Sequence, residues 1–254
     1  MTLALMAAMP EELEALLAPL SAPRIHHHAG REFHSGWLDG QEVVLVLSRI
    51  GKVAAATTAT LLIERFGAEA IVFTGVAGGL NPLARVGDVV VARELLQHDL
   101  DASPLFPRHE VPLTGRSRFP TDAVLSDSLL QAARDAVDAE RIALGDAWAA
   151  LGITAPQVHE GLVVSGDRFV ATAAVGAALR HELPDALAVE MEGAALAQVC
   201  HDCDLPFAVL RCISDRADDQ AHVDFKRFLS EVAGPLAGAV VRAWLRRGAG
   251  GRPM

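Results

Sequence analysis

Cysteine and basic residues are scarce in this sequence of 254 residues. The 3 Cys cannot pair completely within one chain, which argues against a disulfide scaffold. Lys and Arg total 22 against 32 Asp and Glu, and the net charge of -10 would repel a phosphate backbone, so we expect no nucleic-acid partner. The first residues lack the basic segment of a secretory signal. A reducing cytoplasm is therefore the expected location.

Several functional motifs are also missing. No apolar run approaches the ~20 residues that cross a bilayer, so we expect no membrane association. The glycine-rich stretch 75–79 lacks the Lys-Ser/Thr ending of a phosphate-binding P-loop, and no Gly-x-Ser-x-Gly elbow is present for acyl transfer. Residues 200–203 contain two Cys and one His, but no second pair of metal ligands lies at a suitable spacing. The three His at 26–28 lie in a predicted polar surface loop. We therefore expect no metal site.

Short apolar runs alternate with Ala- and Leu-rich stretches of helical length. The runs expected to be strands are 3–8, 42–47, 70–73, 88–92, 161–165, 187–189 and 207–213. Helices are expected to begin at Pro10 and to cover 53–65, 126–139, 173–181, 191–201 and 225–246. Fully apolar strands that alternate with helices indicate a mostly parallel sheet covered on both faces.

The chain shows no internal repeat or low-complexity linker. One domain over residues 1–247 with a flexible tail at 248–254 is the simplest organisation. Residues 99–120 contain four Pro, several charges and no clear periodicity. This segment is predicted to be a long functional loop or an arm that reaches a partner subunit.

Four carboxylates, Glu12, Glu190, Glu192 and Asp215, directly follow predicted apolar strands. In open α/β sheets the ligand crevice lies outside the carboxyl ends of the strands, which makes these residues functional candidates. Each also has a structural explanation by itself, such as a helix N-terminus, a solvated position or a turn cap. Buried carboxylates need hydrogen-bonding partners, and the two vicinal hydroxyls of a ribose would supply them. Arg211, inside an apolar strand, predicts a buried or site-facing ion pair.

Six motifs then occur in order between residue 8 and about residue 229. They are Ala8-Met9-Pro10-Glu11-Glu12, Ile50-Gly51-Lys52-Val53, Thr74-Gly75-Val76-Ala77-Gly78-Gly79, Ser165-Gly166-Asp167-Arg168-Phe169, Val189-Glu190-Met191-Glu192 and Ile213-Ser214-Asp215. Together they resemble the bacterial 5′-methylthioadenosine/S-adenosylhomocysteine nucleosidases of the purine nucleoside phosphorylase superfamily.

The resemblance implies a single-domain α/β fold of the purine nucleoside phosphorylase type, with a central mixed, twisted, partly barrel-like sheet flanked by helices. It implies a homodimer whose active site borrows residues across the interface. The implied reaction is hydrolysis of the N-glycosidic bond between adenine and a 5′-thio-substituted ribose, in methionine salvage and the recycling of S-adenosylmethionine by-products. The implied substrate is a small nucleoside, and no metal or cofactor takes part.

The resemblance also assigns roles to individual residues. Asp215 matches the general acid that protonates adenine N7, which requires a raised pKa, and Ser214 would orient its carboxylate. Glu12 matches the residue that positions and deprotonates the attacking water. Glu192 matches the carboxylate that holds the ribose hydroxyls and stabilises an oxocarbenium-like transition state, with Met191 packed beneath the sugar.

Other positions match the walls of the family pocket. Phe169 would stack on adenine and the backbone of Val170 would bind the base edge, while Ile50 and Phe225 would line the 5′-alkylthio pocket. The remaining matching positions are Met9, Ala77, Gly78, Glu190 and Arg211.

Three other functions stay open. A phosphorylase of the same superfamily would use phosphate, although Glu12 would repel that anion. A nucleosidase could instead prefer another adenosine-like nucleoside, such as 5′-deoxyadenosine or aminodeoxyfutalosine. A non-catalytic nucleoside sensor would not need Glu12 opposite Asp215.

The sequence departs from the family pattern at Val76, where many members carry Ser or Thr, and in residues 99–120 and 138–159.

Overall fold

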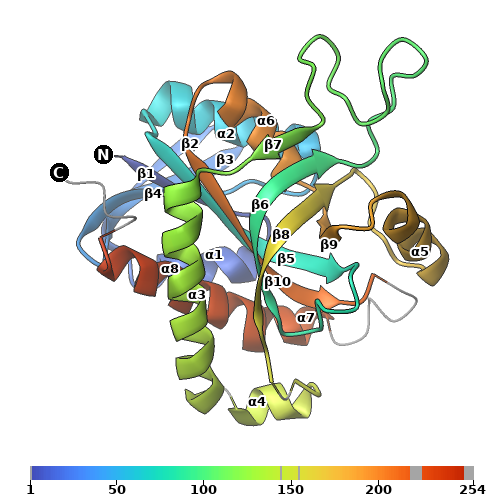
Figure 1. Cartoon of the computed structure of the whole chain (residues 1–254). Coiled ribbons are helices and arrows are strands. Elements are labelled where there is room, and N and C mark those ends of the chain that lie inside the picture. Colours follow the sequence, from blue (N-terminus) through green and yellow to red (C-terminus); the bar gives the residue numbers. More distant parts are fainter. Residues whose placement is uncertain (1, 144, 154, 218–224, 249–254) are drawn as a thin grey trace.

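The computed structural model describes residues 2–143, 145–153, 155–217 and 225–248. A mixed, twisted sheet runs through the middle of the molecule, and helices cover it on both sides (Figure 1). Of the predicted tail, 248–254, only residue 248 lies within the described residues.

The described residues form ten strands in one sheet. They are β1 (Leu3–Ala7), β2 (Ser21–His28), β3 (Arg31–Leu38), β4 (Gln41–Leu47), β5 (Ala70–Gly79), β6 (Val89–Gln97), β7 (Arg118–Pro120), β8 (Val158–Ser165), β9 (Ala186–Glu190) and β10 (Phe207–Asp215). Their order is β10-β6-β8-β9-β5-β1-β4-β3-β2, with β7 added to β6.

Five of these strands close into a barrel, because β10 pairs with both β6 and β5. The pairs β10–β6 and β5–β9 are antiparallel, whereas β5–β10, β6–β8 and β8–β9 are parallel. The sheet is therefore mixed and partly barrel-like, as the family resemblance implies. Most pairings among the strands expected from the apolar runs are parallel, whereas β2, β3 and β7, which the apolar runs did not indicate, pair antiparallel. Long β5 belongs to the barrel and also pairs with β1, which leads to the open part of the sheet.

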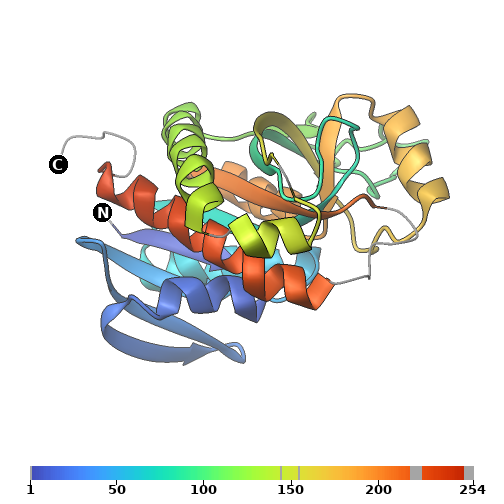
Figure 2. The same ribbon diagram turned by 90° about the horizontal axis from the view of Figure 1, so that it is seen from below.

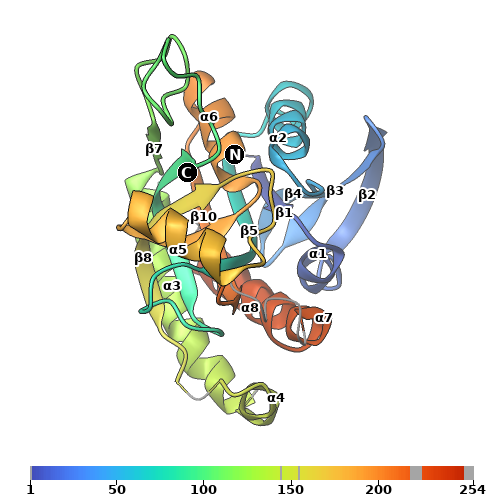
Figure 3. The same ribbon diagram turned by 90° about the vertical axis from the view of Figure 1, so that its right-hand side faces the viewer.

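The helices are α1 (Pro10–Leu17), α2 (Lys52–Phe66), α3 (Ala123–Ala143), α4 (Gly145–Ala150), α5 (Ala173–Glu182), α6 (Gly193–Asp202), α7 (Phe225–Phe228) and α8 (Gly234–Arg246), with a π-helical turn η1 (Leu229–Ala233) between the last two. Seen from the side in Figure 3, α2 and α6 lie on one side of the sheet, and α1 and α8 lie on the other. Figure 2 shows α3 crossing α8.

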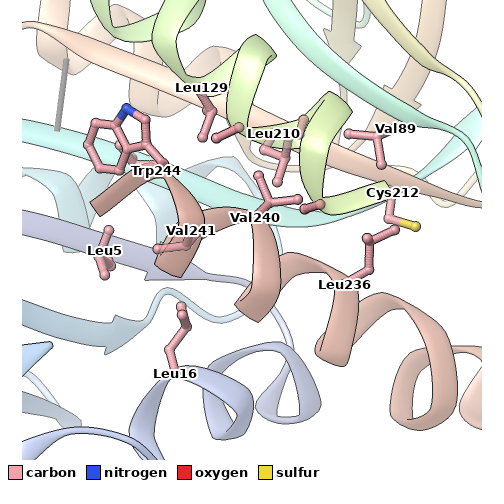
Figure 4. Close-up of a cluster of buried hydrophobic side chains, with 14 of the residues drawn as sticks. Leu5, Leu16, Val89, Leu129, Leu210, Cys212, Leu236, Val240, Val241 and Trp244 are labelled. Atoms are coloured by element: carbon pink, nitrogen blue, oxygen red, sulfur yellow. The ribbon is translucent and has the colours of Figure 1, made fainter. Parts of the chain in front are cut away.

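Side chains of β1 alternate between two hydrophobic cores, as the period of two in a strand requires. Leu5 packs with the core under α1, α3 and α8, whereas Met6 packs with the core under α2 and α6. In the first core, Trp244 and Val241 of α8 lie near Leu16 of α1 and Leu5 (Figure 4). Complete burial of one such aliphatic side chain contributes roughly 1.5–3 kcal/mol, so the two cores hold the helices firmly on the barrel.

The segment Phe225–Arg246 corrects the expectation that no apolar run is long enough to cross a membrane. By length and composition its 22 residues pass that test, but 67% of the apolar window is buried inside the protein. Leu236, Val240 and Trp244 face the core beneath α3. The apolar character of this helix therefore reflects packing in the core of the fold.

Two sequence-based boundaries were wrong for physical reasons. The three His at 26–28 lie in β2, an edge strand rather than a loop, and all eight residues of β2 are exposed, so no hydrophobic pattern marked it. Strand β5 continues through Gly79 instead of ending in a glycine loop, because Gly78 and Gly79 pair with β9. The glycine at position 79 serves close packing, since a Cβ there would meet the carbonyl oxygen of Ala84 at 2.4 Å. Residues 99–120 are largely irregular, as expected, and end in β7.

Candidate active site

One cavity collects most of the residues that the family motifs single out. It lies where β1, β4, β5, β8, β9 and β10 end, together with the start of α7. Twelve of the fourteen predicted site residues line it, namely Met9, Ile50, Ala77, Gly78, Phe169, Val170, Glu190, Met191, Glu192, Ser214, Asp215 and Phe225. The other two, Glu12 and Arg211, are both 0% exposed and lie behind the lining.

The strand register explains why these ends meet. Gly78 of β5 pairs with Val189 of β9 and also with Asp215 of β10, where a bulge between Ile213 and Asp215 shifts the register. A bulge re-aims side chains that a regular ladder would send to alternate faces. Barrel closure thus places residues from three distant parts of the sequence beside one another.

Asp215 is held by hydrogen bonds to both carboxylate oxygens. Ser214 Oγ donates to Oδ2 at 2.7 Å, and the backbone N–H of Ala217 donates to Oδ1 at 2.8 Å. Asp215 is buried, with 8% of its surface exposed. Its orientation is therefore set by neighbours on its own strand end, and Ser214 occupies the position expected of an orienting residue.

Glu192 follows β9 and faces the cavity with 5% of its surface exposed. The backbone N–H of Gly51 donates to its Oε1 at 2.8 Å. Burial raises the pKa of Glu192, and the nearby negative charge of Glu190 raises it further, while the Gly51 hydrogen bond and Arg211 oppose both effects. Whether Glu192 is ionised therefore depends on the hydrogen-bond donors beside it and on the molecule bound in the cavity.

Glu190 and Arg211 form the buried ion pair that the sequence predicted. Arg211 Nη2 lies 2.6 Å from Glu190 Oε2, and both side chains are almost completely buried. Glu190 also accepts hydrogen bonds from Ser165 Oγ and from the backbone N–H of Gly193. Arg211 Nη1 donates to the carbonyl oxygen of Phe73, whose ring lies 4.2 Å below the guanidinium carbon. This saturated pair braces the wall of the cavity rather than offering free groups to a ligand.

Glu12 lies in the first turn of α1, just beneath the cavity. Its Oε2 accepts the backbone N–H groups of Met9 at 2.9 Å and Ala8 at 3.1 Å, as in half of a capping box. Its Oε1 is buried without a hydrogen-bond partner in the described structure. Burial raises the pKa of Glu12 to about 7, against the lowering effect of these N–H groups, of Arg211 and of the nearby backbone N–H of Val76. One oxygen therefore caps the helix, while the other remains available as a proton acceptor.

Gly75 leaves little space for a side chain between Glu12 and Arg211. A Cβ at Gly75 would lie 3.2 Å from Arg211 Nη1 and 3.5 Å from Glu12 Oε1. The absence of a side chain at Gly75 lets these opposite charges approach each other behind strand β5.

Apart from Arg168, the rest of the cavity is lined mainly by apolar side chains. Phe169 is 43% exposed and Ile50 is 56% exposed, so both present hydrophobic surface at its opening, whereas Val170 is buried at 6%. Met191 and Phe225 complete the apolar lining. A flat or alkyl group bound here would be sandwiched between apolar side chains.

Sequence reasoning missed four lining residues. They are Ala8, Arg168 and Val189, together with Val76, which was noted only as a departure from the family pattern. All four belong to the family motifs themselves, so the motifs were the available signal. Nothing in the sequence indicated that the backbone N–H of Gly51 reaches Glu192, 141 residues later.

Among the described residues, no group of three or more His, Cys, Asp or Glu is arranged to hold a metal ion. Cys200 and Cys212 are buried free thiols, and Cys203 is exposed. Burial raises the pKa of both buried thiols, so neither is an activated nucleophile.

The closed mixed barrel and the carboxylate-lined cavity at its strand ends define an α/β protein of the purine nucleoside phosphorylase type. Comparison with known sequences agrees, since the model of the phosphorylase superfamily matches residues 2–246. The chain belongs to the phosphorylase superfamily.

The most similar relatives share one name. The 5′-methylthioadenosine/S-adenosylhomocysteine nucleosidase of Mycobacterium bovis is 37% identical over 250 residues, which cover 95% of this chain and 96% of the relative. The crystal structure of the Neisseria meningitidis enzyme of the same name, in complex with methylthio-immucillin-A, superimposes with a TM-score of 0.85 and 34% identity, covering 97% and 99% of the two chains. The futalosine hydrolase of Helicobacter pylori also matches, with a TM-score of 0.81, 30% identity and 97% of each chain covered.

Proposed function

We propose that this chain is a nucleosidase that hydrolyses the N-glycosidic bonds of 5′-methylthioadenosine and S-adenosylhomocysteine, releasing adenine and the 5-thio-substituted ribose. The observation that carries the proposal is the meeting of Glu12, Glu192 and Asp215 around one apolar cavity. The names of relatives that align over nearly the whole chain support the same activity. This reaction belongs to methionine salvage and to the recycling of S-adenosylmethionine by-products.

In this mechanism Asp215 donates a proton to adenine N7 as the glycosidic bond breaks. Protonation turns adenine into a better leaving group, and Ser214 holds the carboxyl group in position through its 2.7 Å hydrogen bond. Phe169 stacks on the base, and the backbone of Val170 hydrogen-bonds the base edge. Because Ser214 and Asp215 are consecutive residues at the end of β10, the donor is part of the rigid barrel.

Glu192 binds the ribose hydroxyls and stabilises the positive charge that develops on the sugar, while Met191 packs beneath the ring. Glu12 accepts a proton from the attacking water through its otherwise unpartnered Oε1. Since burial places the pKa of Glu12 at about 7, its carboxylate is a stronger base than an exposed glutamate. Bond cleavage and water addition therefore use carboxylates from the ends of β9 and β10 and from the first turn of α1.

The electrostatics of the cavity favour water over phosphate as the nucleophile. Arg211, the buried cation nearest to Glu12, is already engaged by Glu190 and by backbone carbonyl oxygens. A phosphate placed beside Glu12 and Glu192 would meet two carboxylates, and the engaged Arg211 could not offset their charge. Hydrolysis is accordingly the proposed chemistry.

The test is adenine release from methylthioadenosine by purified protein, in phosphate-free buffer and again with added phosphate, with the sugar product identified each time. Free 5-methylthioribose without phosphate is the expected result. Turnover that requires phosphate and yields the sugar 1-phosphate would make the protein a phosphorylase. Binding of the nucleoside without cleavage in either buffer would make it a sensor.

Substrate preference is tested in the same assay. The similarity to a futalosine hydrolase makes aminodeoxyfutalosine a necessary comparison, along with 5′-deoxyadenosine and S-adenosylhomocysteine. We expect kcat/KM to be higher for the two thio-nucleosides, because Ile50 and Phe225 place apolar surface in the cavity. A clear preference for aminodeoxyfutalosine would reassign the substrate and leave the reaction class unchanged.

We further propose that the protein acts as a cytoplasmic homodimer, with residues 1–247 forming one nucleosidase domain. The large apolar side chains of Val53, Leu105 and Leu113 are 78%, 85% and 91% exposed, which supports their burial against a second copy. Light scattering at micromolar concentration should give twice the chain mass of 26.8 kDa. A monomer with full activity would reject the dimer.

A further inference from the structure

Two loops that contribute to the cavity are tied together by hydrogen bonds outside it. One loop joins β4 to α2 and leads into Lys52, and the other follows β8 and carries Asp167. The backbone N–H of Lys52 donates to Asp167 Oδ1 at 2.7 Å. Asp99, which follows β6, accepts from both: Lys52 Nζ lies 2.6 Å from its Oδ1, and the Asp167 N–H lies 2.8 Å from its Oδ2. We call Lys52, Asp99 and Asp167 the loop clamp.

The loop clamp lies next to the site without entering it. None of its three members is among the described residues that line the cavity. Gly51, directly before Lys52, donates its N–H to Glu192, and Phe169 stands two residues after Asp167. The clamp therefore connects the group that holds Glu192 to the loop that carries the base-stacking ring.

The backbone at Gly51 explains why the connection is tight. Gly51 has φ of 99°, a conformation that favours glycine, and its N–H is directed at Glu192 Oε1. A Cβ at Gly51 would lie 3.1 Å from Asp167 Oδ1, so the two loops are already in close contact. A movement of Lys52 or Asp167 would turn the adjacent peptide and carry the Gly51 N–H away from Glu192.

The environment of Asp99 favours its ionised form. Lys52 and Asp99 have side chains that are only 17% and 30% exposed, which limits screening by water. Burial by itself would raise the pKa of Asp99, but the hydrogen bonds from Lys52 and from the Asp167 N–H outweigh it and hold that pKa below its usual range. Charge-assisted hydrogen bonds of this length are stronger than neutral ones, so the loop clamp resists opening.

We propose that Lys52 is a positioning residue for the nucleosidase reaction. Through Asp99 and Asp167 it fixes the Gly51 N–H on Glu192, and so orients the carboxylate that holds the ribose without touching the substrate. The proposal rests on the function proposed above. Glu192 needs such a donor because it is buried beside the like charge of Glu190.

The experiment compares Lys52→Met and Lys52→Arg with the parent protein in methylthioadenosine hydrolysis. For Lys52→Met we expect kcat to fall on the order of 10- to 100-fold, with KM changed by less than about 3-fold, because the misplaced Glu192 acts mainly in the transition state. Lys52→Arg keeps a cation in reach of Asp99 and should recover most of the loss.

The pH profile provides a readout that loss of stability alone would not move. The Gly51 N–H favours the ionised form of Glu192, so its displacement should shift the acid limb of kcat/KM to higher pH. Within the part of the chain that the structure describes, the charged groups that most affect the pKa of Glu192 are Glu190, Arg211 and Glu12, and the variant leaves all three in place.

The matched control is Arg242→Met. Arg242 of α8 forms a comparable ion pair with Asp39, at 2.8 Å, outside the cavity lining. We expect this variant to lose thermal stability but to keep the parent kcat and pH profile. If Lys52→Met behaves like Arg242→Met in both respects, the positioning role is rejected while the nucleosidase function stands.

Asp99→Asn tests the same link if Lys52→Met does not fold, because it removes only the charge. A normal kcat and pH profile in a folded Asp99→Asn protein would reject the proposal. A parent protein that releases no adenine would refute the proposed function, which is a distinct result from a parent that is active and variants that are unaffected.

Discussion

Gly78 of β5 lies directly against the carboxylate of Asp215. A Cβ at residue 78 would come within 2.9 Å of Asp215 Oδ1 and 3.0 Å of the Ala217 Cβ. Strand pairing places these residues opposite each other, so the site requires a residue without a side chain beside its proposed proton donor. The same close approach makes the position of Asp215 sensitive to a single methyl group.

Gly78→Ala should therefore lower kcat on the order of 10- to 100-fold by displacing Asp215 or the turn at Ala217. Steady-state kinetics with methylthioadenosine measure this effect. Gly145→Ala is the matched control, because a Cβ at Gly145 meets nothing within 4 Å. Equal activities of the two variants would show that Asp215 tolerates the contact.

Asp215→Asn should keep the shape of the site and lose the proton. Asn keeps one oxygen that can accept from the Ala217 N–H, and its amide NH2 can donate to Ser214 Oγ, so nucleoside binding should stay within a few-fold of the parent. We expect kcat to fall on the order of 10²- to 10⁴-fold, the usual contribution of a general acid. Calorimetric binding and single-turnover kinetics separate the two effects. A variant with near-normal turnover would remove Asp215 from this role.

Glu12→Gln should lose turnover and gain stability at about pH 8. A carboxyl group whose pKa rises from 4.5 to about 7 on folding costs roughly 3 kcal/mol of stability once the pH exceeds the higher value. Gln carries no charge there and still accepts from the N–H of Met9, so Tm should rise by several degrees. Thermal unfolding at pH 8 and at pH 5 checks this, since the gain should largely vanish at pH 5. A lower Tm at pH 8 would mean that the Glu12 charge is well compensated in the folded protein.

Activity should fall as the pH drops below about 7. Glu12 must be ionised to accept a proton, so kcat/KM should fall about tenfold per pH unit below its pKa, and more steeply if Glu192 must be ionised as well. Unfolding does not explain such a loss, because groups with raised pKa bind more protons in the folded state and favour folding as the pH falls from about 7 to 4.5. Parallel circular dichroism verifies that the protein stays folded. A flat profile between pH 5 and 8 would contradict Glu12 as the base.

Arg211→Met should destabilise the fold by about 3–5 kcal/mol, because Glu190 would remain buried without its counter-charge. The double variant Arg211→Met with Glu190→Gln should recover part of this loss, since no buried charge remains. Urea unfolding of the parent, both single variants and the double variant gives the coupling energy. Additive effects would show that the pair contributes no interaction of its own.

Much of the core was readable from the sequence because its residues obey a local pattern. The apolar runs at β1, β4 and β10 and the helices α2, α5 and α6 lie close to their predicted positions. Strand β2 escaped prediction because its stability comes from backbone pairing with β3 rather than from buried side chains. The glycines of β5 suggested a loop because close packing against Ala84 and β10 has no local signature.

The sequence by itself determined the family and the identity of the chemical groups, since Glu12, Glu192 and Asp215 occur within ordered motifs. Only the tertiary structure decided how these groups work together. Barrel closure through β10 and β5 brings Asp215 beside Gly78, and the loop clamp brings the Gly51 N–H to Glu192. The burial that raises the pKa of Glu12 likewise comes from the packed fold. Distances and dielectric environment depend on contacts between distant residues, which no local pattern of side chains specifies.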